Sequence, residues 1–197
     1  MAKGSLFIIS GPSGTGKGTV CAELVKHDNI FLSISATTRN KRVGETEGET
    51  YFYTTKEQFE EMIKKDMMLE YAVYSGNYYG TPKAAVENML KEGKNVILEI
   101  EAQGALKVKE KMPEAILIFI VPPSIKELRD RLLKRGREDA SEIEKRIEAA
   151  KWEFSQSPKY NYVLVNDELE TCVSATLDII KSANERQQLI ERLLSEI

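Results

Sequence analysis

Cysteine and histidine are scarce in this chain. Its 197 residues include two cysteines, Cys21 and Cys172, and one histidine, His27. Two cysteines do not make a disulfide framework, and together with a single histidine they do not suggest a zinc site. A chain without disulfides is typical of a reducing compartment, so we expect a cytoplasmic location.

Long hydrophobic runs are also missing. The longest run, Ala115 to Val121, ends at Pro122-Pro123 and is far shorter than the roughly 20 apolar residues of a membrane-spanning helix. Residues 1–5 lack the apolar stretch of a signal peptide. The sequence therefore predicts no membrane partner.

Neither sign of charge dominates. The chain has 28 Lys and Arg against 31 Asp and Glu, a net charge of −3. This balance argues against a general binder of nucleic acid or of membrane surfaces. A chain of this length can bury a core within a single domain.

Short β-rich runs alternate with helical patterns along the chain. Strands that alternate with helices predict an α/β fold with a parallel sheet covered by helices. Helix starts are indicated by capping boxes at Ser124 and Ser141, and by Thr81-Pro82. A final helix is expected from about Glu168. The expected strands are Leu6–Ser10, Phe31–Ala36, Val96–Ile100, Ile116–Val121 and Tyr162–Val165.

The most specific motif follows the first of these strands. It reads Gly11-Pro12-Ser13-Gly14-Thr15-Gly16-Lys17-Gly18-Thr19 and precedes a helical pattern. A strand, a glycine-rich turn and a helix are the context of a P-loop, whose backbone N–H groups and lysine hold phosphates. The positive end of the helix adds to this attraction. Gly18 departs from the usual pattern, in which Ser or Thr at that position holds Mg²⁺.

Two acidic residues end a strand that is otherwise apolar. Glu99 and Glu101 close the run Val96–Glu101, and side chains two apart share one face of a strand. Carboxylates at the end of a core strand are costly unless they serve a ligand or a metal. In P-loop enzymes this place belongs to the acidic group near Mg²⁺.

Arginines gather in two further segments. Arg39 and Arg42 lie in one of them, and Arg131 and Arg135, with Arg146 farther on, lie in the other. The planar guanidinium group suits phosphate, because it can donate two hydrogen bonds together. Taken alone, however, the first pair is better explained as solvated loop arginines. The turn at residues 75–81, rich in tyrosine, is by itself better explained as an ordinary β-hairpin.

Taken together, these segments resemble the guanylate kinase family over essentially the whole chain. The resemblance implies a P-loop core with a parallel sheet, made of residues 1–34, 82–124 and 151–197. It also implies an inserted GMP-binding subdomain at 35–81 and a mobile lid at 125–150. The segments that carry it are Gly11–Lys17, Ser35–Arg39, Gly76–Gly80, Pro122–Ser124, Arg131-Leu132 with Arg135-Gly136, and Val165–Asp167.

The resemblance also implies a reaction, the transfer of the γ-phosphate of MgATP to GMP or dGMP. ATP would be held by the P-loop residues Gly11, Pro12, Ser13, Gly14, Thr15, Gly16, Lys17, Gly18 and Thr19, with Asn166 near adenine. GMP would be held by Ser35, Arg39, Arg42, Tyr51, Glu70, Tyr79, Thr81, Glu99 and Glu101. In this assignment Glu70 accepts the guanine N1–H and amino group. The catalytic cations would be Lys17, Arg131, Arg135 and Arg146.

The resemblance also bears on the metal and the partners, but it leaves some of their details open. Mg²⁺ would accompany ATP, with Glu99 or Glu101 holding it either directly or through water. ATP and GMP are the expected partners, without nucleic acid, and the oligomeric state stays open. Two alternatives remain: an inactive guanylate-kinase-like module for protein interaction, and a kinase for another monophosphate such as AMP. The intact Gly16-Lys17 argues against the first alternative, and Glu70 argues against the second.

Overall fold

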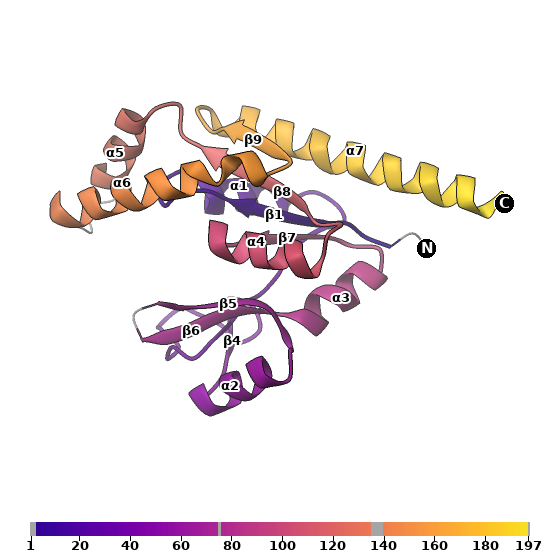
Figure 1. Cartoon of the computed structure of the whole chain (residues 1–197), viewed down its shortest axis with the longest axis horizontal. Coiled ribbons are helices and arrows are strands. Elements are labelled where there is room, and N and C mark those ends of the chain that lie inside the picture. Colours follow the sequence, from indigo (N-terminus) through magenta and orange to yellow (C-terminus); the bar gives the residue numbers. More distant parts are fainter. Residues whose placement is uncertain (1–2, 75, 135–139, 197) are drawn as a thin grey trace.

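The computed structural model describes residues 3–74, 76–134 and 140–196. The main sheet has five parallel strands in the order β2-β7-β1-β8-β9 (Figure 1). The strands are β1 (Leu6–Ser10), β2 (Ile30–Leu32), β7 (Asn95–Glu99), β8 (Ile116–Val121) and β9 (Tyr162–Val165). The α/β fold expected from the sequence is confirmed.

The central strand β1 shows why its sequence forms a buried parallel strand. Leu6 and Ile8 point into one hydrophobic cluster, and Phe7 and Ile9 point into another. All four side chains are at most 2% exposed. A strand covered on both faces has no polar side, so a continuous apolar run replaces the usual alternation.

Helices supply the two covering layers. The helices α1 (Lys17–Leu24) and α7 (Leu169–Ser195) pack on the face of Phe7 and Ile9. The helices α3 (Lys83–Lys91) and α4 (Ala102–Lys111) pack on the opposite face. The end of α7 extends beyond the body of the molecule (Figure 1).

A second sheet lies beside α4. Its mixed strands have the order β4-β3-β6-β5. Helix α2 (Lys56–Lys64) covers it with the buried ring of Phe59. Figure 1 shows α4 between this sheet and the main sheet. The strands are β3 (Ala36–Thr37), β4 (Phe52–Tyr53), β5 (Met68–Tyr74) and β6 (Asn77–Pro82).

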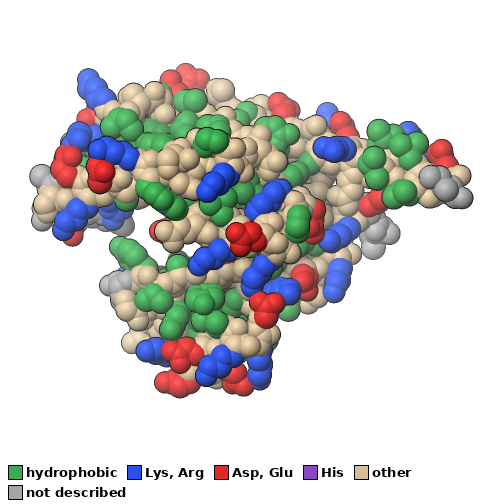
Figure 2. Space-filling model, in the orientation of Figure 1, with side chains coloured by type: hydrophobic (Ala, Val, Ile, Leu, Met, Phe, Trp, Pro, Cys, Tyr) green, Lys and Arg blue, Asp and Glu red, His purple; other side chains and the backbone are tan. Residues whose placement is uncertain are grey.

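The remaining helices form a small unit of their own. α5 (Ile125–Lys134) and α6 (Ala140–Ser155) pack together through a cluster that includes Leu128, Leu132 and Ile147. A short 3₁₀ turn, Ser157–Lys159, then leads to β9. Figure 2 shows the molecule hollowed where α5 and α6 overhang the second sheet.

Two local predictions were wrong, and a third was off by one residue. The expected strand over residues 31–36 is divided, because the chain leaves the main sheet after Leu32 and joins the second sheet at Ala36. The helix start expected at Thr81-Pro82 is correct to within one residue, since α3 begins at Lys83 with Pro82 as its N-cap, but the Thr81 hydroxyl is bound to Glu70 and does not cap the helix. Ser141 lies inside α6, which begins at Ala140. Ser124 does cap its helix, since its hydroxyl accepts from the N–H of Glu127 at 3.0 Å.

None of the helices in the described part of the chain is both long enough and apolar enough to cross a membrane.

Candidate active site

The P-loop lies between the end of β1 and the start of α1. Gly16 is the N-cap of α1 with a φ of 88°, a left-handed conformation that glycine adopts without strain. A side chain there would also collide with the amide of Asn166, and one at Gly11 would collide with the carbonyl of Ile120. Within the described residues no side chain caps this helix end, so its N–H groups face the loop. The P-loop predicted from the sequence therefore has the required geometry.

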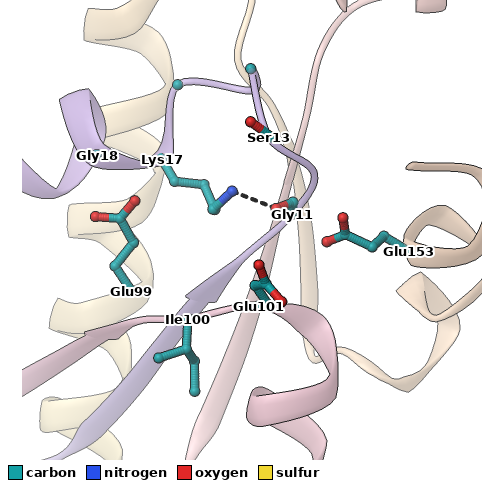
Figure 3. A pocket seen from close by; sticks show the side chains of 10 residues that line it. Gly11, Ser13, Lys17, Gly18, Glu99, Ile100, Glu101 and Glu153 are labelled. Atoms are coloured by element: carbon teal, nitrogen blue, oxygen red, sulfur yellow. Dashed lines mark hydrogen bonds between the residues drawn. The ribbon is translucent and has the colours of Figure 1, made fainter. Parts of the chain in front are cut away.

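A cavity of about 330 Å³ opens beside this loop (Figure 3). It lies at the carboxyl ends of β1 and β7, where ligands of open α/β sheets bind. Its lining residues are Gly11, Ser13, Gly14, Gly16, Lys17, Gly18, Glu99, Ile100, Glu101 and Glu153.

Lys17 is the cation of this cavity. Its ammonium group donates to the carbonyl of Gly11 and, at 3.0 Å, to the carbonyl of Pro12. Burial lowers the pKa of Lys17, while the carboxylates of Glu153, Glu99 and Glu101 act in the opposite direction. The lysine is thus held at the loop with its charge supported by the surrounding carboxylates.

These carboxylates come from three different elements. Glu99 is the last residue of β7, Glu101 is the N-cap of α4, and Glu153 belongs to α6. The prediction that Glu99 and Glu101 share one face of a strand was therefore wrong, because the chain turns out of the sheet at Ile100. Figure 3 shows the three carboxylates around the end of Lys17.

Glu153 was missed by the sequence analysis. Its Oε2 atom is buried and has no hydrogen-bond partner among the described residues, and burial raises its pKa. The signal for it was the spacing from Arg146. Residues seven apart lie on the same face of a helix, so Glu153 and Arg146 both turn toward the P-loop.

Gly18 leaves room for a carboxylate. A Cβ atom at this position would lie 3.4 Å from Oε1 of Glu99. Thr19, by contrast, is exposed and does not line the cavity. No group of three or more His, Cys, Asp or Glu that could hold a metal is found in the described part of the chain.

Two of the predicted catalytic arginines contact the P-loop region. Arg146 of α6 donates to the hydroxyl of Ser13 at 2.7 Å. Arg131 of α5 pairs with Glu127, one helical turn earlier, at 2.8 Å and donates to the carbonyl of Asn166 at 3.0 Å. The third, Arg135, lies outside the described residues.

Asn166 is hydrogen-bonded to the backbone of the P-loop. Its side-chain amide donates to the carbonyl of Thr15 at 2.8 Å, and its own backbone N–H donates to Val121. The residue is 6% exposed and does not line the cavity beside the P-loop. The structure therefore places it as a brace between the P-loop and Arg131.

A second cavity of about 340 Å³ lies between the second sheet and α4. Of the predicted GMP-binding residues, it brings together Ser35, Tyr51, Glu70, Tyr79, Glu99 and Glu101. Gln103, Gly104 and Lys107 of α4 also line it. Arg39, Arg42 and Thr81 do not line it: Arg39 is paired with Glu45, Arg42 is exposed, and Thr81 lies behind Glu70.

Glu70 is the buried acid of the second cavity. The hydroxyl of Thr81 donates to its Oε1 atom at 2.8 Å. Burial raises the pKa of Glu70, while the Thr81 hydroxyl and the charge of Lys107 oppose that rise. Its carboxylate therefore keeps acceptor positions for a ligand that offers N–H donors.

Arg39 is held by an acid that the sequence analysis did not single out. Its guanidinium group contacts Glu45 at 2.7 Å and lies over the ring of Tyr51. Arg39 and the backbone N–H of Arg42 lower the pKa of Glu45 to about 2, so this carboxylate is ionised at neutral pH. Tyr53 also donates to Glu45 at 2.8 Å. No periodic spacing marks such a loop contact in advance.

The two cavities adjoin each other. Glu99, Ile100 and Glu101 line both of them. One side of this segment faces the P-loop and the other faces Glu70 and the tyrosines. If each cavity held a phosphate-bearing ligand, the two ligands would therefore come together at these carboxylates.

A P-loop site with an adjoining pocket for a phosphate acceptor is typical of nucleotide kinases, which bind a phosphate donor and a phosphate acceptor side by side on one α/β core. The sequence model of the guanylate kinase family matches residues 3–183, so the chain belongs to that family, as its motifs indicated.

Individual relatives agree with this assignment. Guanylate kinase of Clostridium perfringens is 56% identical over 172 residues, which are 87% of this chain and 80% of that protein. Guanylate kinase of Halalkalibacterium halodurans is 51% identical and covers 96% of this chain and 94% of that protein. The crystal structure of guanylate kinase from Anaplasma phagocytophilum matches with a TM-score of 0.73 at 32% identity, over 92% of this chain and 86% of that chain.

Proposed function

We propose that this protein transfers the γ-phosphate of MgATP to GMP, and to dGMP, which carries the same base and phosphate. The observation that carries the proposal is the segment Glu99–Glu101, which lines both the P-loop cavity and the Glu70 cavity. Two cavities with a shared wall suit a direct transfer between two bound nucleotides.

ATP occupies the P-loop cavity in this proposal. Backbone N–H groups of the loop and the end of α1 bind its phosphates, and Lys17 turns from the carbonyls of Gly11 and Pro12 toward the β- and γ-phosphates. Asn166 acts mainly by holding the loop, because its amide is already bound to Thr15.

GMP occupies the second cavity. Glu70 accepts the N1–H and the amino group of guanine, with Thr81 fixing the carboxylate from behind. Ser35 lies at the base, and Tyr51, Tyr79 and Arg39 hold the phosphate. Glu45 keeps Arg39 in place through their ion pair at 2.7 Å. Arg42, which is exposed here, would have to turn inward to join them.

Mg²⁺ fits this site as a companion of ATP. Gly18 offers no hydroxyl, but it leaves the Glu99 carboxylate 3.4 Å from where its Cβ would lie. Mg²⁺ keeps several waters and prefers one or two carboxylates with substrate phosphates to a cage of protein ligands. Glu99 or Glu101 would hold it, through water. When bound, the ion supplies charge neutralisation at the β- and γ-phosphates.

The reaction needs no covalent enzyme intermediate. A phosphate oxygen of GMP forms a bond to the γ-phosphorus while the bond from that phosphorus to the β–γ bridging oxygen breaks, giving GDP and ADP. Lys17, Arg131, Arg135 and Arg146 neutralise the negative charge spread over the transferring group. Residues 35–81 act as the GMP-binding subdomain and residues 125–150 as a closing lid that excludes water.

A coupled assay of ADP release tests this proposal. We expect turnover with GMP and dGMP and at most trace turnover with AMP, UMP and CMP, because a site built to accept N–H donors from the base can discriminate by roughly 10⁴-fold. Equal rates with AMP would contradict the role of Glu70. No turnover with any monophosphate would favour the interaction module.

A further inference from the structure

Gly104 is an unusual choice for the place it occupies. It is the third residue of α4 and is buried. It is not among the residues with positive φ, so the backbone does not require glycine there. Glycine is among the weakest helix formers, and Ala would serve the helix better. Something other than the helix itself therefore accounts for the missing side chain.

The contact that a side chain would make points to Glu70. A Cβ atom at position 104 would lie 3.0 Å from Oε2 of Glu70 and 3.4 Å from its Cδ. On its other side the carboxylate is fixed by the Thr81 hydroxyl, 2.8 Å from Oε1. Because Glu70 is only 7% exposed, it has little room to move away. One methyl group at position 104 would shift the carboxylate by a few tenths of an ångström.

We propose that Gly104 is a positioning residue for guanine recognition, because its missing side chain reserves the place of the Glu70 Oε2 atom. The proposal rests on the proposed function, in which Glu70 accepts two N–H donors from guanine. Two parallel hydrogen bonds to one carboxylate depend on alignment, and hydrogen bonds weaken steeply when their angles are distorted. Gly104 thus acts through Glu70 and makes no contribution of its own to the bond-forming step.

The neighbours of Gly104 on α4 also line the second cavity. Gln103 and Lys107 line the same cavity, and the Lys107 ammonium lies 5.6 Å from the centre of the Tyr71 ring. The turn of α4 that contains Gly104 therefore faces the proposed site of the guanine base. Its exposed residue Glu110 lies outside that cavity and offers a control position.

Gly104→Ala is the direct test. We expect kcat/KM for GMP to fall about tenfold, mainly through KM, as when one charge-assisted hydrogen bond is weakened. KM for ATP should not change. The preference for GMP over IMP, whose base lacks the amino group, should fall as well. Glu110→Ala, on the same helix, should leave all of these values as they are.

Thermal unfolding and a double-mutant cycle separate this role from packing. Gly104→Ala should keep or raise the melting temperature, since Ala favours the helix. In the Glu70→Gln background the same change should cost much less kcat/KM than in the unmutated protein. Lost stability with an unchanged GMP preference, or effects that simply add, would overturn the proposal. If the unmutated protein does not phosphorylate GMP, the proposed function itself fails.

Discussion

The ionisable side chains of the site differ in how many of their hydrogen-bond positions are already occupied by protein partners. Lys17 is half-buried and donates to loop carbonyls, and Arg39 is already paired with Glu45. Glu70 is buried with one neutral hydroxyl donor, and its pKa is raised by that burial. The cations therefore already have protein partners before a nucleotide arrives, and Lys17 has to exchange its carbonyl partners for phosphate, whereas the acid keeps capacity for new hydrogen bonds.

Lys17→Ala should lower kcat by about 10²-fold or more, because it removes a charge aimed at the phosphates in the transition state. The fold should persist, since Lys17 belongs to neither of the main hydrophobic clusters. Steady-state kinetics and circular dichroism measure the two effects. Lys26→Ala, which removes an exposed lysine after α1, is the matched control. Activity within a few-fold of the unmutated enzyme would refute the P-loop assignment.

Glu70 should give GMP recognition a pH dependence. Burial raises its pKa, so the neutral carboxyl group persists to higher pH than for an exposed glutamate. The protonated form loses an acceptor, and kcat/KM for GMP should therefore fall as the pH drops, starting above the ordinary carboxyl range. Glu70→Gln should have a low kcat/KM without this limb. The same limb in Glu70→Gln would assign the titration to another group, such as the phosphate of GMP.

At the scale of elements, the P-loop and α6 both contribute to the cavity beside the P-loop. The start of α1 presents backbone N–H groups, and α6 presents Arg146 and Glu153. Each element was predictable from local patterns. Their meeting was not, because it depends on how α5 and α6 pack and not on any spacing within one segment.

The start of α1 predicts a difference between Thr19 and Glu99. Successive side chains on a helix are turned by about 100°, so Thr19 points away from the place of the hydroxyl that Gly18 lacks. Thr19→Ala should hardly change the Mg²⁺ concentration for half-maximal rate, whereas Glu99→Ala should raise it. Titration of rate against Mg²⁺ at fixed ATP compares them. A larger shift for Thr19→Ala would mean that Thr19 replaces the missing ligand.

From the position of Arg146 on α6 we predict that this arginine contributes more to kcat than to nucleotide affinity. Its contact with Ser13 places the guanidinium group at the loop, where a positioned arginine can contribute about 10³-fold in rate. Arg146→Ala should lower kcat far more than it raises the dissociation constants of ATP and GMP. Its exposed neighbour Lys145 provides the control Lys145→Ala. Equal losses in binding and turnover would limit Arg146 to a ground-state contact.

At the scale of the whole molecule, sequence patterns predicted what is local. The run Leu6–Ser10, the loop after it and the helix that follows are adjacent along the chain, so their pattern sufficed. The ion pair of Glu45 with Arg39 and the position of Gly104 beside the Glu70 carboxylate depend on the folded second sheet and on α4. Residue spacing along the chain carries no information about such approaches, so these contacts could not be predicted.

The shared wall Glu99–Glu101 also constrains the thermodynamics of the two substrates. Any adjustment of this segment to a ligand in one cavity alters the lining of the other. Coupling between two binding equilibria is reciprocal, so the factor by which GMP changes the affinity for ATP equals the factor by which ATP changes the affinity for GMP. Whichever substrate binds first, the free energy of forming the ternary complex is the same.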